Sequence, residues 1–268
     1  MLGPDCWLTG AEGGYAAYPM WHGVETTDNT THGRPVGPDA AHGNPHGTWF
    51  KVWESDCSNY NGCHPWFYGG DSPQSLPLMM DHWESVYGRG HNYILNLPPS
   101  KSGIIEPNMA AAAAAFGAER HRRYGAGFSD PDTPSACELA RTSGRLAEWS
   151  PTGTATELLL HFPERTAFDR VFLAEDVIHD GQLVAQYSVD ICSDMAGCTG
   201  SGDWRTVVDA KISSNGGQTI GTHHIDIVAA NATAVRLRLL DVLRSPVLPL
   251  IAFRVLHVGS SETEAAPF

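Results

Sequence analysis

The sequence predicts two structural parts, an α/β unit followed by an antiparallel β-sandwich. Between residues 66 and 117, apolar residues recur at helical spacing, then form one short continuous run, and then lead into a second helical segment. After about residue 124, seven short runs alternate apolar and polar residues, and turn residues separate them. We therefore predict a first domain at 1–117 and a second at 118–268.

The first helix of the α/β unit is expected to open at Ser72-Pro73, because proline is tolerated in the first helical turn. The segment ends at the glycine after Tyr87. The apolar residues that recur at helical spacing in between are Leu76, Met79, Met80, Trp83 and Val86.

A strand and a second helix follow. HNYILNLPP (91–99) is a nearly continuous apolar run that two prolines end, which is typical of a parallel strand buried on both faces. SKSG (100–103) makes a turn, Asn108 is the expected cap, and MAAAAAAFGAERHRR (109–123) is rich in strong helix formers. Helix, strand and helix joined by short turns indicate an α/β unit, such as the closing part of a barrel.

The second part consists of short alternating runs. Residues 118–150 show no clear element, and we interpret them as a linker and domain edge. Seven runs at regular spacing favour an antiparallel β-sandwich. They are LLLHF (158–162), DRVFLAED (169–176), QLVAQYSVDIC (182–192), WRTVVDAKI (204–212), HHIDIVAA (223–230), AVRLRLLDV (234–242) and IAFRVLHV (251–258).

Charge and composition exclude several classes of function. The formal net charge is −13, so the surface repels nucleic-acid phosphates, and the only basic run, ERHRR (119–123), is expected at a helix C-terminus. No stretch approaches the roughly 20 apolar residues that a membrane span needs. No Gly-rich phosphate loop follows a strand and no G-x-S-x-G elbow appears, so nucleotide binding and serine hydrolysis are not expected. We expect no cofactor. The oligomeric state stays open.

Cysteines and sequons favour an oxidising compartment. Cys57-SNYNG-Cys63 and Cys192-SDMAG-Cys198 repeat one pattern, and we predict a disulfide in each. Cys6 and Cys137 are left over. Asn29-Thr-Thr and Asn231-Ala-Thr are potential glycosylation sites. We expect a glycoprotein that is secreted or resides in a lysosome or vacuole, with its signal peptide upstream of Met1, because MLGPDCWL has no signal-peptide pattern.

Glu12 is the first candidate for chemistry, in GPDCWLTGAEGG (3–14). Glycines on both sides remove steric cover, and Trp7 supplies an apolar wall that would raise the pKa of a general acid. The alternative is a solvated acid in a turn. The long Gly-, Pro- and His-rich stretch at 15–50 then fits a loop over the carboxyl-terminal face of a barrel.

Glu54 and Asp56 are the second candidate pair. Two residues apart, they share one face of an extended strand within WFKVWESDC. Trp53 and Trp66 lie nearby in sequence, and aromatic rings with carboxylates suit sugar binding, because rings stack on C–H bonds and carboxylates accept hydroxyl hydrogens. A Trp-rich core with exposed acids explains the pattern about equally well.

Histidines of the early loop do not make a metal site. Their spacing matches no zinc pattern, and the loop is too rich in glycine to fix tetrahedral geometry, so we predict no metal. The histidines considered are His22, His32, His42, His46 and His64.

Four motifs occur in an order that resembles one enzyme family. GPDCWLTGAEGG, WFKVWESD, PWFY and VYGRGHNYILNLPPSKSGII are similar to motifs of the α-L-fucosidases of glycoside hydrolase family 29, in particular the plant-like subgroup that acts on α-1,3/1,4-linked fucose. The most specific stretch is SVYGRGHNYILNLPPSKSG (85–103). FDRVFLAEDVIHDGQLVAQYSVD and QTIGTHH resemble the discoidin-like, galactose-binding-like β-sandwich that follows the barrel in that family.

The resemblance implies a fold, a reaction and a set of site residues. The fold would be the C-terminal part of a (β/α)8-like (TIM) barrel followed by that β-sandwich. The reaction would be retaining hydrolysis of a terminal α-L-fucoside in a fucosylated glycan. Glu12 matches the general acid/base, Glu54 is the fallback acid/base or a substrate-binding residue, and Trp21, Asp56 and Trp66 would line the sugar site.

The resemblance is incomplete in places. Ala11 replaces the asparagine that precedes the family's acid/base, and the proline before the second acid is absent. The family's nucleophilic aspartate ends an earlier barrel strand, so we expect it upstream of Met1 and expect this chain alone to be inactive. The alternatives are a non-catalytic carbohydrate-binding protein built on the β-sandwich, and a structural protein in which the tryptophans are core.

Overall fold

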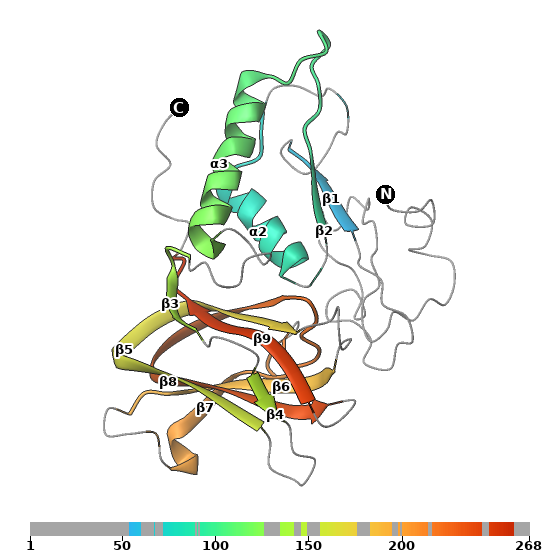
Figure 1. Cartoon of the computed structure of the whole chain (residues 1–268). Helices are drawn as coiled ribbons and strands as arrows, with labels where there is room; N and C mark the ends of the chain where they lie inside the picture. Colours follow the sequence, from blue (N-terminus) through green and yellow to red (C-terminus); the bar gives the residue numbers. More distant parts are fainter. Residues whose placement is uncertain are drawn as a thin grey trace.

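The computed structural model describes a helical part packed on a large sheet. The described residues are 54–59, 67, 72–88, 90, 92–125, 135–141, 146–148, 156–175, 183–194, 198, 200–213, 216–242 and 247–259. In Figure 1 the helices and a short parallel strand pair occupy the upper half of the molecule, and the large sheet forms the lower half.

The upper half is the predicted α/β unit. It contains strand β1 (Glu54–Ser58), helix α2 (Leu76–Tyr87), strand β2 (Asn92–Asn96) and helix α3 (Pro107–Tyr124). β1 and β2 pair in parallel, with Glu54 opposite Asn92 and Ser58 opposite Asn96. Because parallel strands need a crossover, α2 lies between them in sequence, as in a β-α-β unit.

The helix boundaries differ in detail from the sequence prediction. α2 begins at Leu76 with Ser75 as its N-cap, three residues after the predicted Ser72 opening, and Pro77 lies in its first turn. α3 begins at Pro107 behind Glu106, so Asn108 is the second helical residue and not the cap. In both cases a proline in the first turn sets the start, because its fixed φ suits that position. The basic run does end α3 as predicted.

The lower half is one seven-stranded antiparallel sheet with the order β3-β9-β5-β8-β6-β7, in which β4 also pairs with β9. Figure 1 shows that the sheet curls. The strands are β3 (Glu138–Arg141), β4 (Leu146–Glu148), β5 (Thr156–Glu175), β6 (Val184–Cys192), β7 (Trp204–Val208), β8 (His224–Val242) and β9 (Val247–Leu256), and a 3-10 turn at Ser201–Asp203 precedes β7.

Two pairs of predicted runs prove to be single long strands. LLLHF and DRVFLAED both belong to β5, and HHIDIVAA and AVRLRLLDV both belong to β8. The register between β5 and β8 shifts between His161 and Thr166 and again between Phe168 and Arg170. Such bulges let a strand bend without ending, which is why the alternation in the sequence is interrupted there.

The described residues within 118–150, where we expected no clear element, include the end of α3 and two strands. α3 runs through the predicted boundary at 117/118 to Tyr124, and β3 and β4 follow it. β3 and β4 are short and both pair with β9. Runs of three or four residues are too short for an alternation pattern to be detected.

The interior of the curled sheet holds the larger apolar core. β5, β6, β8 and β9 each contribute alternate residues, so Val171, Leu173, Tyr187 and Phe253 are fully or almost fully buried in it. Alternate strand residues point to opposite faces of a sheet, so the intervening residues of β5 lie on the other face.

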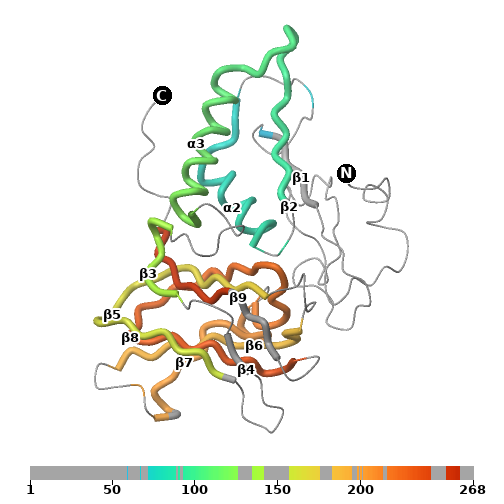
Figure 2. The backbone as a smooth tube through the Cα atoms, in the orientation of Figure 1, coloured from blue at the N-terminus to red at the C-terminus, as the bar shows by residue number. Residues whose placement is uncertain are grey.

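A second apolar cluster joins the helices to the sheet. On the helical side it includes Met80 and Trp83 of α2 together with Phe116 of α3, and on the sheet side it includes Phe172 and Ile225. Figure 2 shows both helices above the sheet, with the lower end of α3 near β3. β5 is thus buried on both faces over this stretch, as the side chains at 171–174 show.

The disulfide prediction is confirmed for one pair. Cys192 at the end of β6 is bonded to Cys198, with 6.0 Å between their Cα atoms. Cys137 is a free, buried thiol. Cys6 and Cys63 lie outside the described residues, so the pair Cys57–Cys63 stays a prediction. Neither described helix is long and apolar enough to cross a membrane.

Candidate functional site

Most of the predicted site residues lie outside the described part of the chain. Glu12, Trp21 and Trp66 are among those, so their positions stay predictions. Glu54 and Asp56 occupy the first and third positions of β1. Their Cα partners on β2 are Asn92 and Ile94.

The carboxyl ends of β1 and β2 form one edge of the α/β unit. Asn59 extends the ladder past β1, because its N–H donates to the carbonyl of Asn96 at 2.9 Å. Asn59 is fully buried, and its side-chain amide donates to the carbonyl of Met109 in the first turn of α3 at 3.0 Å. The Gln74 N–H in turn donates to the Asn59 carbonyl. In α/β folds, ligands bind at this edge, so it is the candidate site in the described residues.

The turn after β2 reverses the chain, so that the first turn of α3 lies next to this edge. The Ser100 N–H donates to the Ile104 carbonyl at 2.7 Å, and the Gly103 N–H donates to the Ser100 carbonyl at 2.9 Å. Gly103 has φ of 83°, a left-handed conformation that glycine adopts without steric cost. The predicted SKSG turn is therefore present, and its glycine is required. β2 is less buried than predicted, since Ile94 is 37% exposed.

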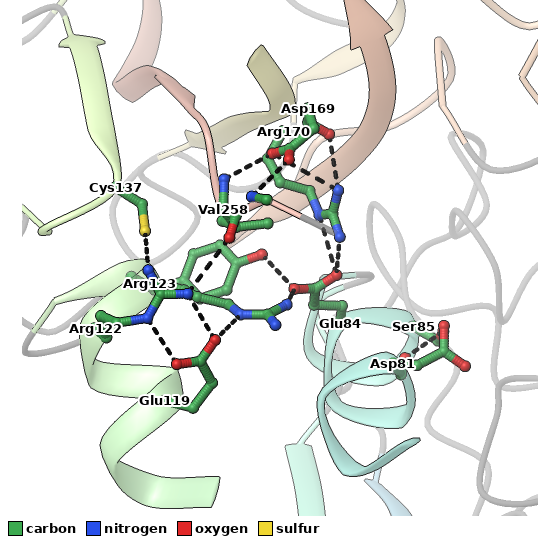
Figure 3. A network of polar contacts seen from close by, with 12 residues as sticks. Asp81, Glu84, Ser85, Glu119, Arg122, Arg123, Cys137, Asp169, Arg170 and Val258 are labelled. Atoms are coloured by element: carbon green, nitrogen blue, oxygen red, sulfur yellow. Dashed lines mark hydrogen bonds and ion pairs between the residues drawn. The ribbon is translucent and has the colours of Figure 1, made fainter. Parts of the chain in front are cut away.

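A buried carboxylate, Glu84, connects the α/β unit to the sheet (Figure 3). Arg123 and the Tyr124 hydroxyl of α3 donate to its Oε1 at 2.8 and 2.9 Å. Arg170 of β5 donates to its Oε2 through two nitrogens at 2.8 and 3.0 Å. The Glu84 side chain is only 3% exposed, so two arginines and a phenol replace its water shell. Burial, together with the neighbouring Glu84 carboxylate, raises the pKa of Tyr124 well above its ordinary value.

A neighbouring network of Glu119 and Arg122 continues this junction at the end of α3. Glu119 accepts hydrogen bonds of 2.7 Å from both Arg122 and Arg123. The bond from Arg122 is the main cause that lowers the Glu119 pKa from 4.5 to about 2. Arg122 also donates to the Cys137 sulfur and to the carbonyl of Val258, as Figure 3 shows. These side chains form hydrogen bonds with one another or with the backbone. Their arrangement therefore favours a role in holding the α/β unit and the sheet together.

Glu175, at the end of β5, is a second buried carboxylate. Burial raises its pKa from 4.5 to about 7, against the lowering effect of three backbone donors. Those donors are the N–H groups of Leu183, Val184 and Gly221, at 2.8–2.9 Å. A raised carboxyl pKa can indicate a general acid. Glu175 is 2% exposed, however, and spans two loops, so its geometry is that of a structural clamp.

Sequence reasoning missed both buried glutamates, although a signal was present for each. Glu84 follows Met80 by four residues and so lies on the apolar face of α2. Glu175 follows Val171 and Leu173 at period two and so lies on the core face of β5. An acid at an apolar position of either period indicates a buried, paired carboxylate.

Within the described ranges, no three His, Cys, Asp or Glu side chains come together in an arrangement that would hold a metal ion. His224 and Asp226 of β8 form a further buried polar group with Tyr187. Asp226 accepts a hydrogen bond of 2.8 Å from the Tyr187 hydroxyl, and its other oxygen lies 3.3 Å from His224 Nε2. All three residues are at most 2% exposed, so this group is part of the sheet core.

Comparisons with known proteins connect this fold to one family. No protein-family model matches the chain. A protein of Oryza sativa subsp. japonica with an α-L-fucosidase name is 25% identical over 235 residues, covering 82% of this chain and 42% of the relative. Alpha-L-fucosidase 1 of Arabidopsis thaliana is 24% identical over 228 residues, covering 80% of this chain and 43% of the relative. The chain thus spans less than half the length of these relatives.

Solved structures show the same fold. A glycoside hydrolase 29 family member from an unknown rumen bacterium matches with a TM-score of 0.63 and 20% identity, covering 94% of this chain and 40% of that one. A Ruminococcus gnavus family 29 fucosidase in complex with fucose matches with a TM-score of 0.63 and 17% identity, covering 90% and 48%. The chain is therefore similar in sequence to plant proteins named as α-L-fucosidases, and it shares its fold with solved structures of glycoside hydrolase family 29.

Proposed function

We propose that the chain carries the acid/base side of an α-L-fucosidase active site. The observation that supports this most is its similarity, over 80% of its length, to plant proteins named as α-L-fucosidases, together with motifs that keep the family's order. The substrate class is then a glycan with a terminal α-L-fucose, and the subgroup resemblance favours α-1,3 or α-1,4 linkages. The barrel-plus-discoidin-like architecture is part of the same proposal.

In this proposal the reaction proceeds with retention, through a covalent fucosyl-enzyme. Glu12 protonates the glycosidic oxygen as the bond to the anomeric carbon breaks, and then removes a proton from the water that releases fucose. The nucleophilic carboxylate must lie roughly 5 Å from it. We place that nucleophile outside the stretch matched by this chain, on an earlier barrel strand. Glu54 is the second candidate for the acid/base.

Sugar recognition is assigned to the residues that flank these acids. Trp21 and Trp66 would stack on the apolar face of the fucose ring or of the sugar that carries it. Asp56 would accept hydrogen bonds from sugar hydroxyls. Two described features support this placement, since β1 carries position 56 on a strand paired to β2, and Asn59 ties the end of β1 to α3.

The rigidity of this support matters because a catalytic carboxylate must be held within a fraction of an ångström. β1 and β2 cannot move independently of α3 without breaking the Asn59 bond to Met109. α3 cannot move independently of α2 and β5 without breaking the buried Glu84 contacts to Arg123 and Arg170. The strand that carries Glu54 and Asp56 is therefore part of one connected framework.

We also propose that the protein works in a secretory compartment, outside the cell or in a lysosome or vacuole. The Cys192–Cys198 disulfide supports this, because such bonds persist where the surroundings are oxidising.

Binding of L-fucose by the full chain is the first test. Saturation-transfer NMR should show transfer to L-fucose and none to its mirror image, D-fucose, which matches it in every bulk property. Trp66→Ala should abolish the transfer. Equal transfer to both enantiomers, or to neither, contradicts the proposal.

The second test assigns the acid/base in whatever form of the protein turns over an α-L-fucoside. Replacing the acid/base by glutamine should slow hydrolysis of a natural fucoside by 10²–10⁴-fold. It should slow hydrolysis of an aryl fucoside less, because a good leaving group needs little protonation, and added azide should restore the rate. Glu12→Gln should show this pattern, and Glu164→Gln, at an exposed position of β5, is the matched control. The pattern in Glu54→Gln would assign the role to Glu54.

A further inference from the structure

Asn231 lies on an exposed face of β8. Along this part of the strand, Ile227, Ala229 and Asn231 are exposed, whereas Val228 and Ala232 are buried. The exposed residues therefore share one face, as the period-two pleat requires. Asn231 begins the sequon Asn-Ala-Thr, which the proposed hydrolytic site does not use.

Apolar residues lie on the same face of the sheet as Asn231. Ile227 is 55% exposed, and Ala229 stands between it and Asn231 on the same face. Ala167 of β5 is the Cα partner of Asn231 and is also exposed. We call Ile227, Ala229 and Ala167 the β8 apolar strip. Exposed apolar surface of this kind on a strand favours association with other chains unless something covers it.

The sequon also forms hydrogen bonds with residues at the start of the loop that the Cys192–Cys198 disulfide closes. The Thr233 hydroxyl lies 2.9 Å from the carbonyl of Asp194 and 3.2 Å from that of Cys192, and it donates to them. The Ser193 hydroxyl donates to the carbonyl of Asn231 at 2.8 Å. A disulfide and an exposed sequon asparagine thus occur in one neighbourhood, and both are features of chains that pass through the secretory pathway.

We propose that Asn231 carries an N-linked glycan that covers the β8 apolar strip. The donor is a lipid-pyrophosphate-linked oligosaccharide. The Asn231 amide nitrogen forms a bond to the anomeric carbon of the first sugar, the bond from that carbon to the pyrophosphate oxygen breaks, and the lipid pyrophosphate leaves with the electron pair. The amide gives up one proton. Nothing is oxidised or reduced.

The transfer precedes folding of β8. In the folded chain Thr233 is buried at 9% exposure, and its hydroxyl is held by two carbonyls, so the sequon is not available to an enzyme. In the unfolded chain no such contact exists. The inference rests on the proposed secretory location but not on fucosidase activity, so the two can fail separately.

Glycan occupancy is measured on the full chain, which is given a secretory signal peptide before Met1 and secreted from eukaryotic cells. Mass spectrometry of peptides after peptide N-glycosidase treatment should show conversion of Asn231 to aspartate. Asn231→Gln should abolish that modification and Thr233→Ser should keep part of it, because serine retains the sequon and the hydroxyl. Asn29→Gln is the matched control and should leave Asn231 modified. Unmodified Asn231 in the secreted protein overturns the proposal.

The order of events is tested by cell-free translation. Microsomes added during synthesis should give a glycosylated chain, and microsomes added after folding should give none. Equal modification in both cases contradicts transfer before folding.

The covering role has its own readout. Enzymatically deglycosylated protein and Asn231→Gln should both self-associate more than the glycosylated protein in light scattering. Adding Ile227→Thr to Asn231→Gln should reverse this, because it removes the largest member of the strip. If the glycosylated protein, the deglycosylated protein and Asn231→Gln scatter alike, the glycan does not cover an adhesive surface.

Discussion

At the scale of single residues, two buried glutamates offset the cost of burying a carboxylate with different hydrogen-bond partners. Glu84 meets two arginines and a phenol, so its partners are side chains from α3 and β5. Glu175 meets three backbone N–H groups instead, and its partners carry no full charge. Burial therefore raises the pKa of Glu175. The same residue type thus acts as an ionic junction in one place and as a loop clamp in the other.

Glu84→Ala should destabilise the protein by about 3–5 kcal/mol, because it leaves Arg123 and Arg170 buried without their shared partner. Urea denaturation followed by circular dichroism measures the change. Glu164→Ala, which removes an exposed carboxylate, should change the free energy of unfolding by less than about 0.5 kcal/mol. If Glu84→Ala lowers the free energy of unfolding no more than Glu164→Ala does, the Glu84 junction does not stabilise the protein.

At the scale of elements, strong periodicity was predictable and interrupted periodicity was not. α2 and α3 follow from their spacing and composition, and the seven alternating runs all lie in strands or next to them. The continuity of β5 was hidden by PERTA at 163–167, where proline and polar residues imitate a turn. In the structure this stretch is a bulge within one strand, because β8 continues opposite it. Local sequence cannot distinguish a turn from a bulge here, because pairing with the distant strand β8 determines whether β5 continues.

The close approach of α2 to β8 gives a test at Gly88. Its carbonyl accepts a hydrogen bond from Ile225, and a Cβ built on Gly88 would collide with the backbone carbonyl oxygen of Glu84 and lie 2.9 Å from the Cβ of Ile225. Gly88→Ala should therefore cost about 1–3 kcal/mol through overpacking. Gly117→Ala in α3, where a Cβ would meet nothing within 4 Å, should instead stabilise by about 1 kcal/mol. Thermal denaturation of both variants gives the comparison, and equal signs would contradict the packing argument.

The small disulfide loop gives a second test at this scale. Cys192 and Cys198 are six residues apart, and a loop of this size stabilises by about 2 kcal/mol through restriction of the unfolded chain. The double variant Cys192→Ser, Cys198→Ser should lose that amount in urea denaturation. Reductant should destabilise the unaltered protein by at least that amount, because the predicted Cys57–Cys63 disulfide would be reduced as well. A variant that still responds to reductant would indicate a second disulfide.

At the scale of the whole molecule, the helices and the sheet form one connected body. The apolar cluster and the Glu84 network join them across the same surface of the sheet. The sequence predicted an α/β unit and a strand-rich second part but not this junction. The Met80–Glu84 spacing indicates a buried acid and does not identify the residues that pair with it. The candidate site was predictable only through motif resemblance. Glu12, Trp21 and Trp66 lie outside the described residues, and their roles stay predictions.

The stability of the whole molecule should depend on pH through Glu175. Its folded pKa of about 7 lies above the ordinary 4.5, so the folded state binds more protons between these values. The free energy of unfolding should therefore fall as pH rises from about 4.5 to about 7. Glu175→Gln should flatten this dependence even though it lowers stability at every pH. Urea titrations at several pH values give the slope of the free energy of unfolding against pH for each protein. Identical slopes would show that Glu175 does not cause the pH dependence.

Strand order also determines when the sheet can form during synthesis. β5 lies between β8 and β9, and Thr156 pairs with Leu239, while β3 near the start of the sheet pairs with β9 at Leu256. The β6–β7 pair can close early, because its strands are adjacent in sequence. β5 is released from the ribosome long before either of its neighbours, and pairing over such distances closes slowly. Its twenty residues, apolar on both faces at 171–174, must then wait unpaired, which makes β5 the segment that a molecular chaperone would bind first.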